Sequence, residues 1–334
     1  MGTMKESDIR PQDLFNRYLE LSRLDIGRFF SDQSRFVEIP CPACLRERPE
    51  LGMEKLGFRY LTCLECGSLY LSPRPTVAMF DDYYQESESV KFWGTDFFKA
   101  TSEARRERMF KPRAQMVEQW AADSGMGTSD VFADIGSGYG IFLEEVSNLN
   151  RFGKVIGVEP APNLAAICRE KGFSISEKLV EEVQEGEIDA SFASAFEVIE
   201  HPFDPGDFLQ GVHRLLKPGG KFLFTTLTVT GWDMQVLWEH SKSIYPPHHI
   251  NLMSVSGIRA LVERSGFEIC ELSTPGQLDV DIVRNIVTEN PKIKLTRFAH
   301  QMAFDVSEEV RAAFQEFLQA QNLSSHIRVI AQAK

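Results

Sequence analysis

The sequence predicts an α/β fold, in which a small cysteine-rich module precedes a mostly parallel sheet and a helical insertion precedes the last strand. The first observation is a short apolar strand, residues 131–135, that leads directly into a glycine-rich turn. The second is another apolar strand, residues 154–159, that ends in a carboxylate. The third is a pair of Cys-x-x-Cys motifs at 41–44 and 63–66. Strands that alternate with helical patterns indicate parallel βαβ units, and paired cysteines indicate a metal-binding module.

The chain divides into four predicted segments: a helical start (1–35), the cysteine module (36–75), a linker with a helix at 101–122 that covers the ligand cleft (76–122), and the α/β core (123–334). The core is predicted to contain a helix at 254–265 and strands at 131–135, 154–159, 173–175, 188–194, 221–228, 267–273 and 327–332. The last strand is expected to run antiparallel to the others. Residues 275–324 form a mostly helical insertion, which either folds over the site or forms an oligomer interface.

The glycine-rich turn is the first candidate ligand site. Asp134 lies in the apolar strand, and Gly136, Ser137, Gly138 and Gly140 follow it. Glycines have no Cβ and accept positive φ, so the backbone can turn sharply and pass close to a ligand. The helix that follows presents its unpaired N–H groups to whatever lies in the turn.

Glu159 strengthens this prediction. It ends the second strand, about twenty residues after the turn, where an acid can accept hydrogen bonds from both ribose hydroxyls of an adenosine. This placement fits either NAD or S-adenosylmethionine. The third glycine of the G-x-G-x-x-G pattern is absent, because Gly140 comes one residue early, and this disfavours NAD.

Three motifs resemble class I S-adenosylmethionine-dependent methyltransferases. Asp134 to Gly140 (D-I-G-S-G-Y-G) resembles their first motif, residues 188–202 resemble their fourth strand and its Glu-His continuation, and residues 215–225 resemble their Leu-Lys-Pro-Gly-Gly turn into the fifth strand. The resemblance covers residues 105–275. It implies an enzyme with a Rossmann-like seven-stranded methyltransferase sheet and S-adenosylmethionine as the methyl donor. It also implies that Phe196, at the exit of the fourth strand, contacts this cofactor.

The cysteines predict a zinc ribbon. Cys41, Cys44, Cys63 and Cys66 follow the spacing C-x2-C-x18-C-x2-C, which is typical of a four-thiolate zinc site. Two disulfides or unrelated buried cysteines are the alternatives, and a cytoplasmic setting disfavours disulfides. The zinc is expected to be structural, since four thiolates leave no open coordination position. Cys168 and Cys270 have no nearby partner in the sequence and are predicted to be small core residues.

Three histidines are candidates for a general base. Methyl transfer to an alcohol requires proton removal, for which histidine is suited near neutral pH. His201 follows the fourth predicted strand beside Glu200, and His248 and His249 lie after the fifth strand. Glu200-His201-Pro202 could equally be a structural cap. Side chains that are adjacent on an extended segment point in opposite directions, so only one of the histidine pair is expected to face the cleft, with His249 preferred.

The ribbon joined to this core is similar to the nucleotide-sugar C-methyltransferases of deoxysugar biosynthesis. In that family a histidine closes the motif after the fourth strand, which matches His201, and a Tyr-x-Glu-His stretch after the fifth strand ends in a histidine that matches His249. Here His248 replaces the glutamate and Pro246 replaces the tyrosine. The resemblance therefore implies a sugar nucleotide or glycan precursor as substrate, and these departures favour methylation of a hydroxyl over methylation of a carbon.

Charge and hydropathy limit the other function classes. The net charge of −12 disfavours nucleic acid as a partner, and no apolar run approaches the length of a membrane span. There is no signal-peptide pattern, so the sequence predicts a cytoplasmic protein whose oligomeric state is open. A basic run at residues 105–113 forms either a solvated helix face, which is preferred, or a phosphate site. The alternative functions are a zinc-ribbon RNA methyltransferase and a non-catalytic scaffold.

Overall fold

The computed structural model describes residues 6–334, so residues 1–5 of the predicted helical start lie outside it. The chain forms two compact units, each assembled from three separate segments. The large-sheet unit contains residues 102–226, 259–272 and 328–334, and the small-sheet unit contains residues 6–101, 227–258 and 273–327. Among residues 6–334, no helix is both long enough and apolar enough to cross a bilayer.

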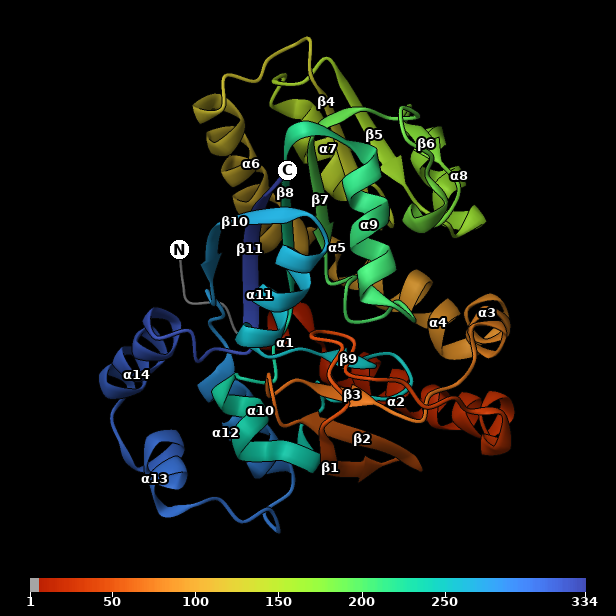
Figure 1. The fold of residues 1–334 in the computed structure, drawn as a ribbon. Helices are drawn as coiled ribbons and strands as arrows, with labels where there is room; N and C mark the ends of the chain where they lie inside the picture. The colour runs from red at the N-terminus through yellow and green to blue at the C-terminus, as the bar shows by residue number, and fades with distance from the viewer. Residues whose placement is uncertain (1–5) are drawn as a thin grey trace. The chain divides into compact units, whose positions relative to one another are not determined.

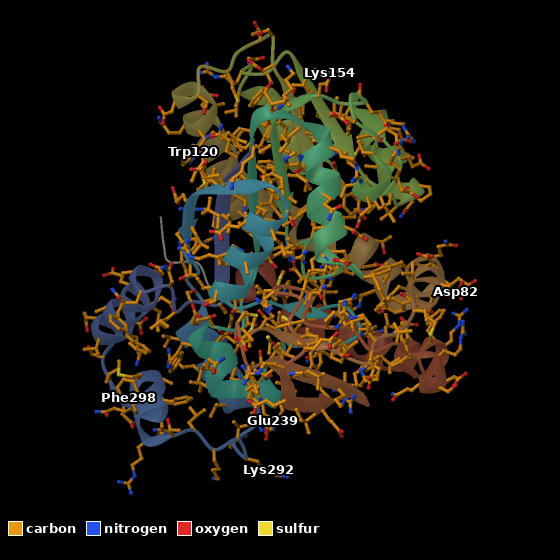
Figure 2. All side chains as sticks on the ribbon, in the orientation of Figure 1. Asp82, Trp120, Lys154, Glu239, Lys292 and Phe298 are labelled. Carbon is orange, nitrogen blue, oxygen red and sulfur yellow. The ribbon has the colours of Figure 1, made fainter. Side chains whose placement is uncertain are left out.

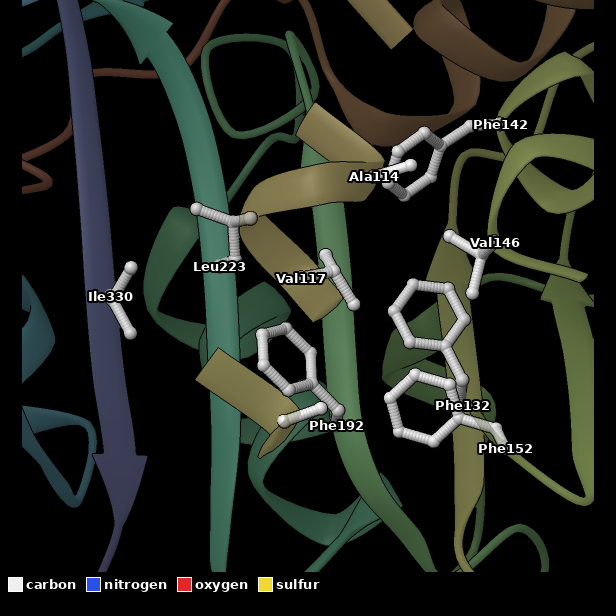
Figure 3. Close-up of a cluster of buried hydrophobic side chains, with 10 residues drawn as sticks. Ala114, Val117, Phe132, Phe142, Val146, Phe152, Phe192, Leu223 and Ile330 are labelled. Carbon is white, nitrogen blue, oxygen red and sulfur yellow. The ribbon is translucent and has the colours of Figure 1, made fainter. Parts of the chain in front are cut away.

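The large sheet has seven strands in the order β10-β11-β8-β7-β4-β5-β6 (Figure 1). Its strands are β4 (Val131–Ile135), β5 (Lys154–Val158), β6 (Ser174–Ser176), β7 (Ala190–Phe196), β8 (Leu216–Leu227), β10 (Phe267–Ser273) and β11 (His326–Ala333). The neighbouring pairs β8–β7, β7–β4, β4–β5 and β5–β6 are parallel. In Figure 3 the arrow of β11, which carries Ile330, runs opposite to that of β8, which carries Leu223. The predicted Rossmann-like seven-stranded sheet is confirmed, including its antiparallel last strand.

The start of β8 differs from the prediction. The strand was expected from residue 221, after a Lys-Pro-Gly-Gly turn, yet it begins at Leu216. The parallel register passes from Ala190–Leu216 to Phe192–Lys221, so residues 217–220 form a bulge within the strand. The glycines mark this irregularity, because they tolerate the conformation that a bulge requires. The fourth predicted strand is also shifted by two residues, to 190–196.

The large sheet carries helices on both faces. Its helices are α6 (Lys111–Asp123), α7 (Ile141–Asn148), α8 (Pro162–Glu170), α9 (Pro205–Leu215) and α11 (Val255–Arg264), the last of which continues from the small-sheet unit. Figure 3 shows one face, where α6 and α7 cover a buried cluster of Ala114, Val117, Phe132, Phe142, Val146, Phe152, Phe192, Leu223 and Ile330. Trp120, labelled in Figure 2, packs against its edge. Because strand side chains alternate, Phe222 lies on the opposite face and contacts Phe267.

The small-sheet unit is built around an antiparallel sheet of order β1-β2-β3-β9. Its strands are β1 (Pro49–Lys55), β2 (Phe58–Cys63), β3 (Leu69–Leu71) and β9 (Asn251–Leu252). The accompanying helices are α1 (Glu6–Ile9), α2 (Gln12–Phe29), α3 (Val77–Glu86), α4 (Glu88–Phe92), α5 (Phe98–Arg105), α10 (Trp232–Leu237), α12 (Asp279–Glu289), α13 (Arg297–His300) and α14 (Glu308–Ala320). The insertion is therefore helical as predicted. The stretch predicted as a linker is helical too, and Thr76 and Ser87 cap α3 and α4.

The two isolated cysteines have different environments. Cys168 is buried, as predicted. Cys270 is exposed, so its assignment to the core is wrong. The reason is the position of β10 at the edge of the large sheet, where Cys270 shares the solvent-facing side of the strand with Glu268.

A buried carboxyl pair lies in the small-sheet unit. Asp233 in α10 and Asp279 at the start of α12 are both almost completely inaccessible to solvent. Asp279 accepts hydrogen bonds from the Ser325 N–H at 2.8 Å, the Ser324 hydroxyl at 2.5 Å and the Gln315 amide at 2.7 Å. Burial, and then repulsion from Asp279, raise the pKa of Asp233 well above its usual value.

Replacing Asp233 with Asn is expected to stabilise the protein at alkaline pH. The folded state keeps a proton that the unfolded chain releases above pH about 4, so the stability of the native protein falls as pH rises from there through the raised pKa. The variant avoids this loss, and its advantage in unfolding free energy should grow between pH 5 and 9 to at least about 1 kcal/mol. Urea denaturation at several pH values measures it. Asp82→Asn, on the exposed carboxylate labelled in Figure 2, is the control, and parallel curves for all three proteins would contradict this expectation.

Candidate functional site

The glycine turn closes the carboxyl end of β4 in a conformation that requires glycine. Gly136, Gly138 and Gly140 have φ angles of +73°, +52° and +70°. A Cβ on Gly136 would lie 2.8 Å from Cγ2 of Val198, and one on Gly140 would lie 2.9 Å from Sγ of Cys168. Gly136 and Gly140 therefore have no room for a side chain, whereas Gly138 has open space around it and favours glycine only through its positive φ.

Glu159 follows β5 and is bound to this turn. Its Oε2 accepts a hydrogen bond from the Gly138 N–H at 2.8 Å, and its Oε1 accepts one from the Ala161 N–H at 3.0 Å. The side chain is 5% exposed, and burial raises its pKa. A carboxylate has about four acceptor positions, so the two oxygens still have capacity for a ribose diol. The site thus fits the predicted role, although contact with ribose stays a prediction.

Asp134 lies at the same edge of the large sheet. Its Oδ1 accepts a hydrogen bond from the Ser194 hydroxyl at 2.6 Å, and the Ser137 hydroxyl donates to its backbone carbonyl at 2.8 Å. Asp134 is 3% exposed, and burial raises the pKa of its carboxyl to about 7, against the hydrogen bond from Ser194. Its charge therefore changes within the physiological pH range.

We expect binding of S-adenosylmethionine to weaken as pH falls from 8 to 6. The cofactor is cationic at its sulfonium and ammonium groups, and below pH about 7 the Asp134 carboxyl is neutral and no longer attracts them. The dissociation constant should rise by up to about tenfold per pH unit below the pKa. Calorimetric titrations of the native protein and Asp134→Asn test this. The variant should bind more weakly at pH 8 with a flatter profile, whereas equal profiles would show that Asp134 does not face the cofactor's charge.

An ion-pair network beside Phe196 has no counterpart in the sequence prediction. Arg113 of α6 pairs with Glu197 at 3.1 Å, and its guanidinium lies 4.4 Å from the centre of the Phe196 ring. The Thr225 hydroxyl donates to the same Glu197 oxygen at 2.7 Å. Glu197 has a φ of +57°, an uncommon backbone conformation at the carboxyl end of a strand. The network holds Phe196 in place, while its contact with the cofactor stays a prediction.

The basic run that contains Arg113 is not simply a solvated helix face. Arg106 pairs with Glu144 and Glu145, and the side chains of Arg106 and Arg113 are 23% and 12% exposed. The preferred interpretation of the run is therefore wrong for these two residues. Acidic residues distant in sequence neutralise them, so the alternative of a phosphate site gains no support either.

His201 follows β7 in a segment tied to the sheet by its neighbour. Glu200 is 1% exposed and accepts a hydrogen bond from the Thr226 hydroxyl at 2.7 Å. The His201 N–H donates to the Val198 carbonyl at 2.9 Å, which closes a turn, and the imidazole is half-buried. Glu200 therefore has the anchoring role of the structural alternative, and His201 remains a candidate base.

His249 is oriented by a backbone carbonyl in the small-sheet unit. Its Nδ1 lies 2.6 Å from the carbonyl oxygen of Ser243. A carbonyl can only accept a hydrogen bond, so Nδ1 carries the proton and Nε2 is the unprotonated nitrogen of the neutral ring. This is the tautomer that a general base needs.

His248 has a different environment. Its Nε2 lies 2.6 Å from the Tyr83 hydroxyl, and the rings of Tyr18, Tyr83 and Tyr84 surround it at centroid distances of 5.6, 5.4 and 6.4 Å. The two adjacent histidines thus have separate partners, but they do not lie on an extended segment as predicted: the His249 N–H donates to the Tyr245 carbonyl at 3.0 Å and closes a turn. Nothing in the local sequence indicated the pairing with Tyr83, which lies 165 positions away.

The four predicted zinc ligands come together. Cys41, Cys44, Cys63 and Cys66 place their Sγ atoms within 4.8 Å of one another, with 3.6 Å between Cys41 and Cys66 and between Cys44 and Cys63. A disulfide would need about 2.05 Å. A tetrahedral zinc with Zn–S bonds of about 2.3 Å places its sulfurs about 3.8 Å apart, so the cluster fits that ion.

Comparisons with known proteins agree with this geometry. A family model described as a methyltransferase domain matches residues 103–272, just over half of the chain. The chain is 28% identical to a ubiquinone biosynthesis O-methyltransferase of Ruegeria pomeroyi, over 50% of this chain and 77% of that protein. It is 33% identical to the protein of the same name from Xanthomonas oryzae, over 29% of this chain and only 43% of that one.

A methyltransferase of Mesorhizobium loti that depends on S-adenosylmethionine aligns with a TM-score of 0.42 and 16% identity, over 62% of this chain and 91% of that one. The family match, the strand order and the glycine turn with Glu159 lead to the same assignment. This chain belongs to the methyltransferase-domain family and is a class I S-adenosylmethionine-dependent methyltransferase.

Proposed function

We propose that this methyltransferase methylates a hydroxyl group, or as a second choice a carbon, of a sugar nucleotide or glycan precursor, with a histidine as general base. The observation that carries the proposal is the Nδ1–H of His249 bound to the Ser243 carbonyl, which makes Nε2 the unprotonated nitrogen of the neutral ring. The matches of His201 and His249 to the nucleotide-sugar C-methyltransferases support the substrate class. The names of the similar O-methyltransferases support oxygen as the acceptor atom.

Each residue has a defined task in this proposal. Bound S-adenosylmethionine supplies an electrophilic methyl group. Asp134 and the turn of Gly136, Ser137 and Gly138 hold its methionine end, and Glu159 holds its ribose. His249 Nε2 would take the proton of the acceptor hydroxyl, whose oxygen would receive the methyl group that the cofactor supplies. Alignment and exclusion of water account for the rest of the rate. His201 and His248 are the other candidates for the base.

The four-cysteine cluster is part of the proposal as a structural zinc site. The purified protein should contain about one zinc ion per chain by elemental analysis, and Cys44→Ser should lower this content. Cys270→Ser is the matched control, because this exposed cysteine lies outside the cluster. Zinc-free, folded native protein would contradict the assignment.

A second substrate class is a phenol or quinol hydroxyl. The proteins named ubiquinone biosynthesis O-methyltransferase favour it, and so do the tyrosine rings around His248, which suit an aromatic acceptor. The same base could serve both classes, because each needs one hydroxyl proton removed.

The decisive experiment is calorimetric titration with S-adenosylmethionine, followed by a screen for release of S-adenosylhomocysteine. Sugar nucleotides, dihydroxybenzoates and total RNA are the three acceptor arms. Turnover on sugar nucleotides supports the proposal, and turnover only on phenols or only on RNA replaces it with that class. If folded, zinc-loaded protein fails to bind the cofactor, the proposal gives way to a non-catalytic scaffold.

A further inference from the structure

We propose that the four-cysteine ribbon positions the histidine segment, residues 245–254, and that Tyr60 and Arg74 are the residues through which it does so. The inference rests on the proposed function only in assigning a histidine of this segment as base. The contacts that carry it all lie within the small-sheet unit. They join the end of the histidine segment, Asn251 and Leu252, to the ribbon's sheet.

The backbone of the segment completes the ribbon's sheet. Strand β9 begins two residues after His249 and pairs with β3 in antiparallel register, Leu69 with Leu252 and Tyr70 with Asn251. The Leu71 N–H donates to the Ile250 carbonyl at 2.9 Å. Strand β9 has only two residues, so it has little stability without the strand beside it.

Tyr60 holds His249 directly. This β2 residue is fully buried, and its hydroxyl donates to the backbone carbonyl of His249 at 2.8 Å. The same histidine is bound through Nδ1 to the Ser243 carbonyl. Tyr60 therefore fixes the main chain of His249 and Ser243 fixes its ring. Together the two contacts set the direction in which Nε2 points. A base must be placed to within a fraction of an ångström, so loss of either bond lowers turnover.

Arg74 fixes the next part of the segment. Its side chain is fully buried, with Nε donating to the Leu71 carbonyl at 3.0 Å and Nη2 donating to Oδ1 of Asn251 at 3.1 Å. Asn251 is itself fully buried. A buried guanidinium bound across β3 and β9 gives the strand pair a single arrangement, because either partner alone would leave polar atoms unsatisfied.

The second cysteine pair reaches the end of the segment. The Ser254 hydroxyl donates to the carbonyl of Cys66, and the Ser254 N–H donates to the Ser68 hydroxyl at 3.1 Å. The Cys66 thiol in turn lies 3.2 Å from that hydroxyl. A predicted metal ligand, Cys66, is thus hydrogen-bonded directly to the end of the histidine segment. Loss of the metal is expected to loosen the contacts of Ser254 with Cys66 and Ser68. Through the pairing of β3 with β9, it is then expected to make His249 more mobile.

The cofactor residues do not share this dependence. Asp134 and Glu159 belong to the large-sheet unit, which has its own buried core. Disturbance of the ribbon should therefore lower turnover while affinity for S-adenosylmethionine persists. This separation of effects distinguishes a positioning role from a general loss of fold.

Tyr60→Phe tests the role with a single lost hydroxyl. In protein labelled with ¹⁵N-histidine, the native His249 should show the Nδ1–H tautomer, and the variant should show a mixture. Backbone amides of residues 248–252 should exchange at least tenfold faster, and kcat should fall about tenfold with the cofactor's dissociation constant within twofold of native. Tyr70→Phe, a buried tyrosine on β3, is the matched control and should change none of these.

Chelation of zinc from the native protein should produce the same tautomer mixture and faster exchange. If the metal-free protein unfolds, the inference is tested by the tautomer and amide exchange of the Tyr60→Phe variant alone. A native tautomer and native exchange in Tyr60→Phe would overturn the inference. These two readouts need no substrate, so they stand apart from the acceptor screen, in which lack of turnover on every acceptor would overturn the proposed function instead.

Discussion

Replacing Glu159 with Ala is expected to weaken binding of S-adenosylmethionine by well over tenfold. The carboxylate is predicted to accept hydrogen bonds from both ribose hydroxyls, and a hydrogen bond to a charged group is worth about 1.5–3 kcal/mol. Each 1.4 kcal/mol is about tenfold in affinity. The substitution also removes the acceptor of the Gly138 N–H, which holds the glycine turn against β5. Calorimetric titration of folded protein measures the change.

Two companion variants make this result specific. Glu177→Ala removes a carboxylate that follows the neighbouring strand β6 and pairs with Arg169 near the surface. The affinity of this variant for S-adenosylmethionine should equal that of the native protein. Glu159→Gln keeps one carbonyl oxygen and should lose less affinity than the alanine variant. Affinity of Glu159→Ala within twofold of native would remove this residue from the cofactor site.

Replacing His249 with Ala is expected to lower kcat by about 10²–10⁴, the range for loss of a general base. The imidazole is held in the tautomer that leaves Nε2 unprotonated. Binding of S-adenosylmethionine should be unchanged, because the cofactor residues belong to the other unit. Steady-state kinetics on the acceptor found in the screen, together with calorimetry, measure both quantities.

The remaining histidines provide the comparison. His240→Ala is the control, because this histidine lies on an exposed short helix and its side chain is 43% exposed. His248→Ala should have a smaller effect than His249→Ala, since its Nε2 is already bound to the Tyr83 hydroxyl. Near-native turnover in His249→Ala together with a large loss in His201→Ala or His248→Ala would move the base to that residue.

The cofactor side of the site was predictable because its signals are local. The turn from Gly136 to Gly140 needs three left-handed glycines within five residues, and Glu159 directly follows the next strand, so each can be recognised without knowledge of distant contacts. The cysteine cluster was predictable for the same reason: each pair lies in one short turn. Arg113, Glu197, Ser194 and Tyr60 had no such signal, since each acts through a partner more than twenty-five positions away.

The sequence by itself determined the seven strands of the large sheet, their glycine turn, the acid after β5 and the grouping of four cysteines. These features depend on residue period, backbone freedom and short spacing, which act within about ten residues. Only the tertiary structure decided that Arg106 and Arg113 are paired, that Cys270 is exposed at a sheet edge, and that the two residues of β9, just after the histidines, pair with the ribbon. Those outcomes depend on which distant segments pack together, because the energy of a long-range contact depends on both of its partners and not on one local stretch of sequence.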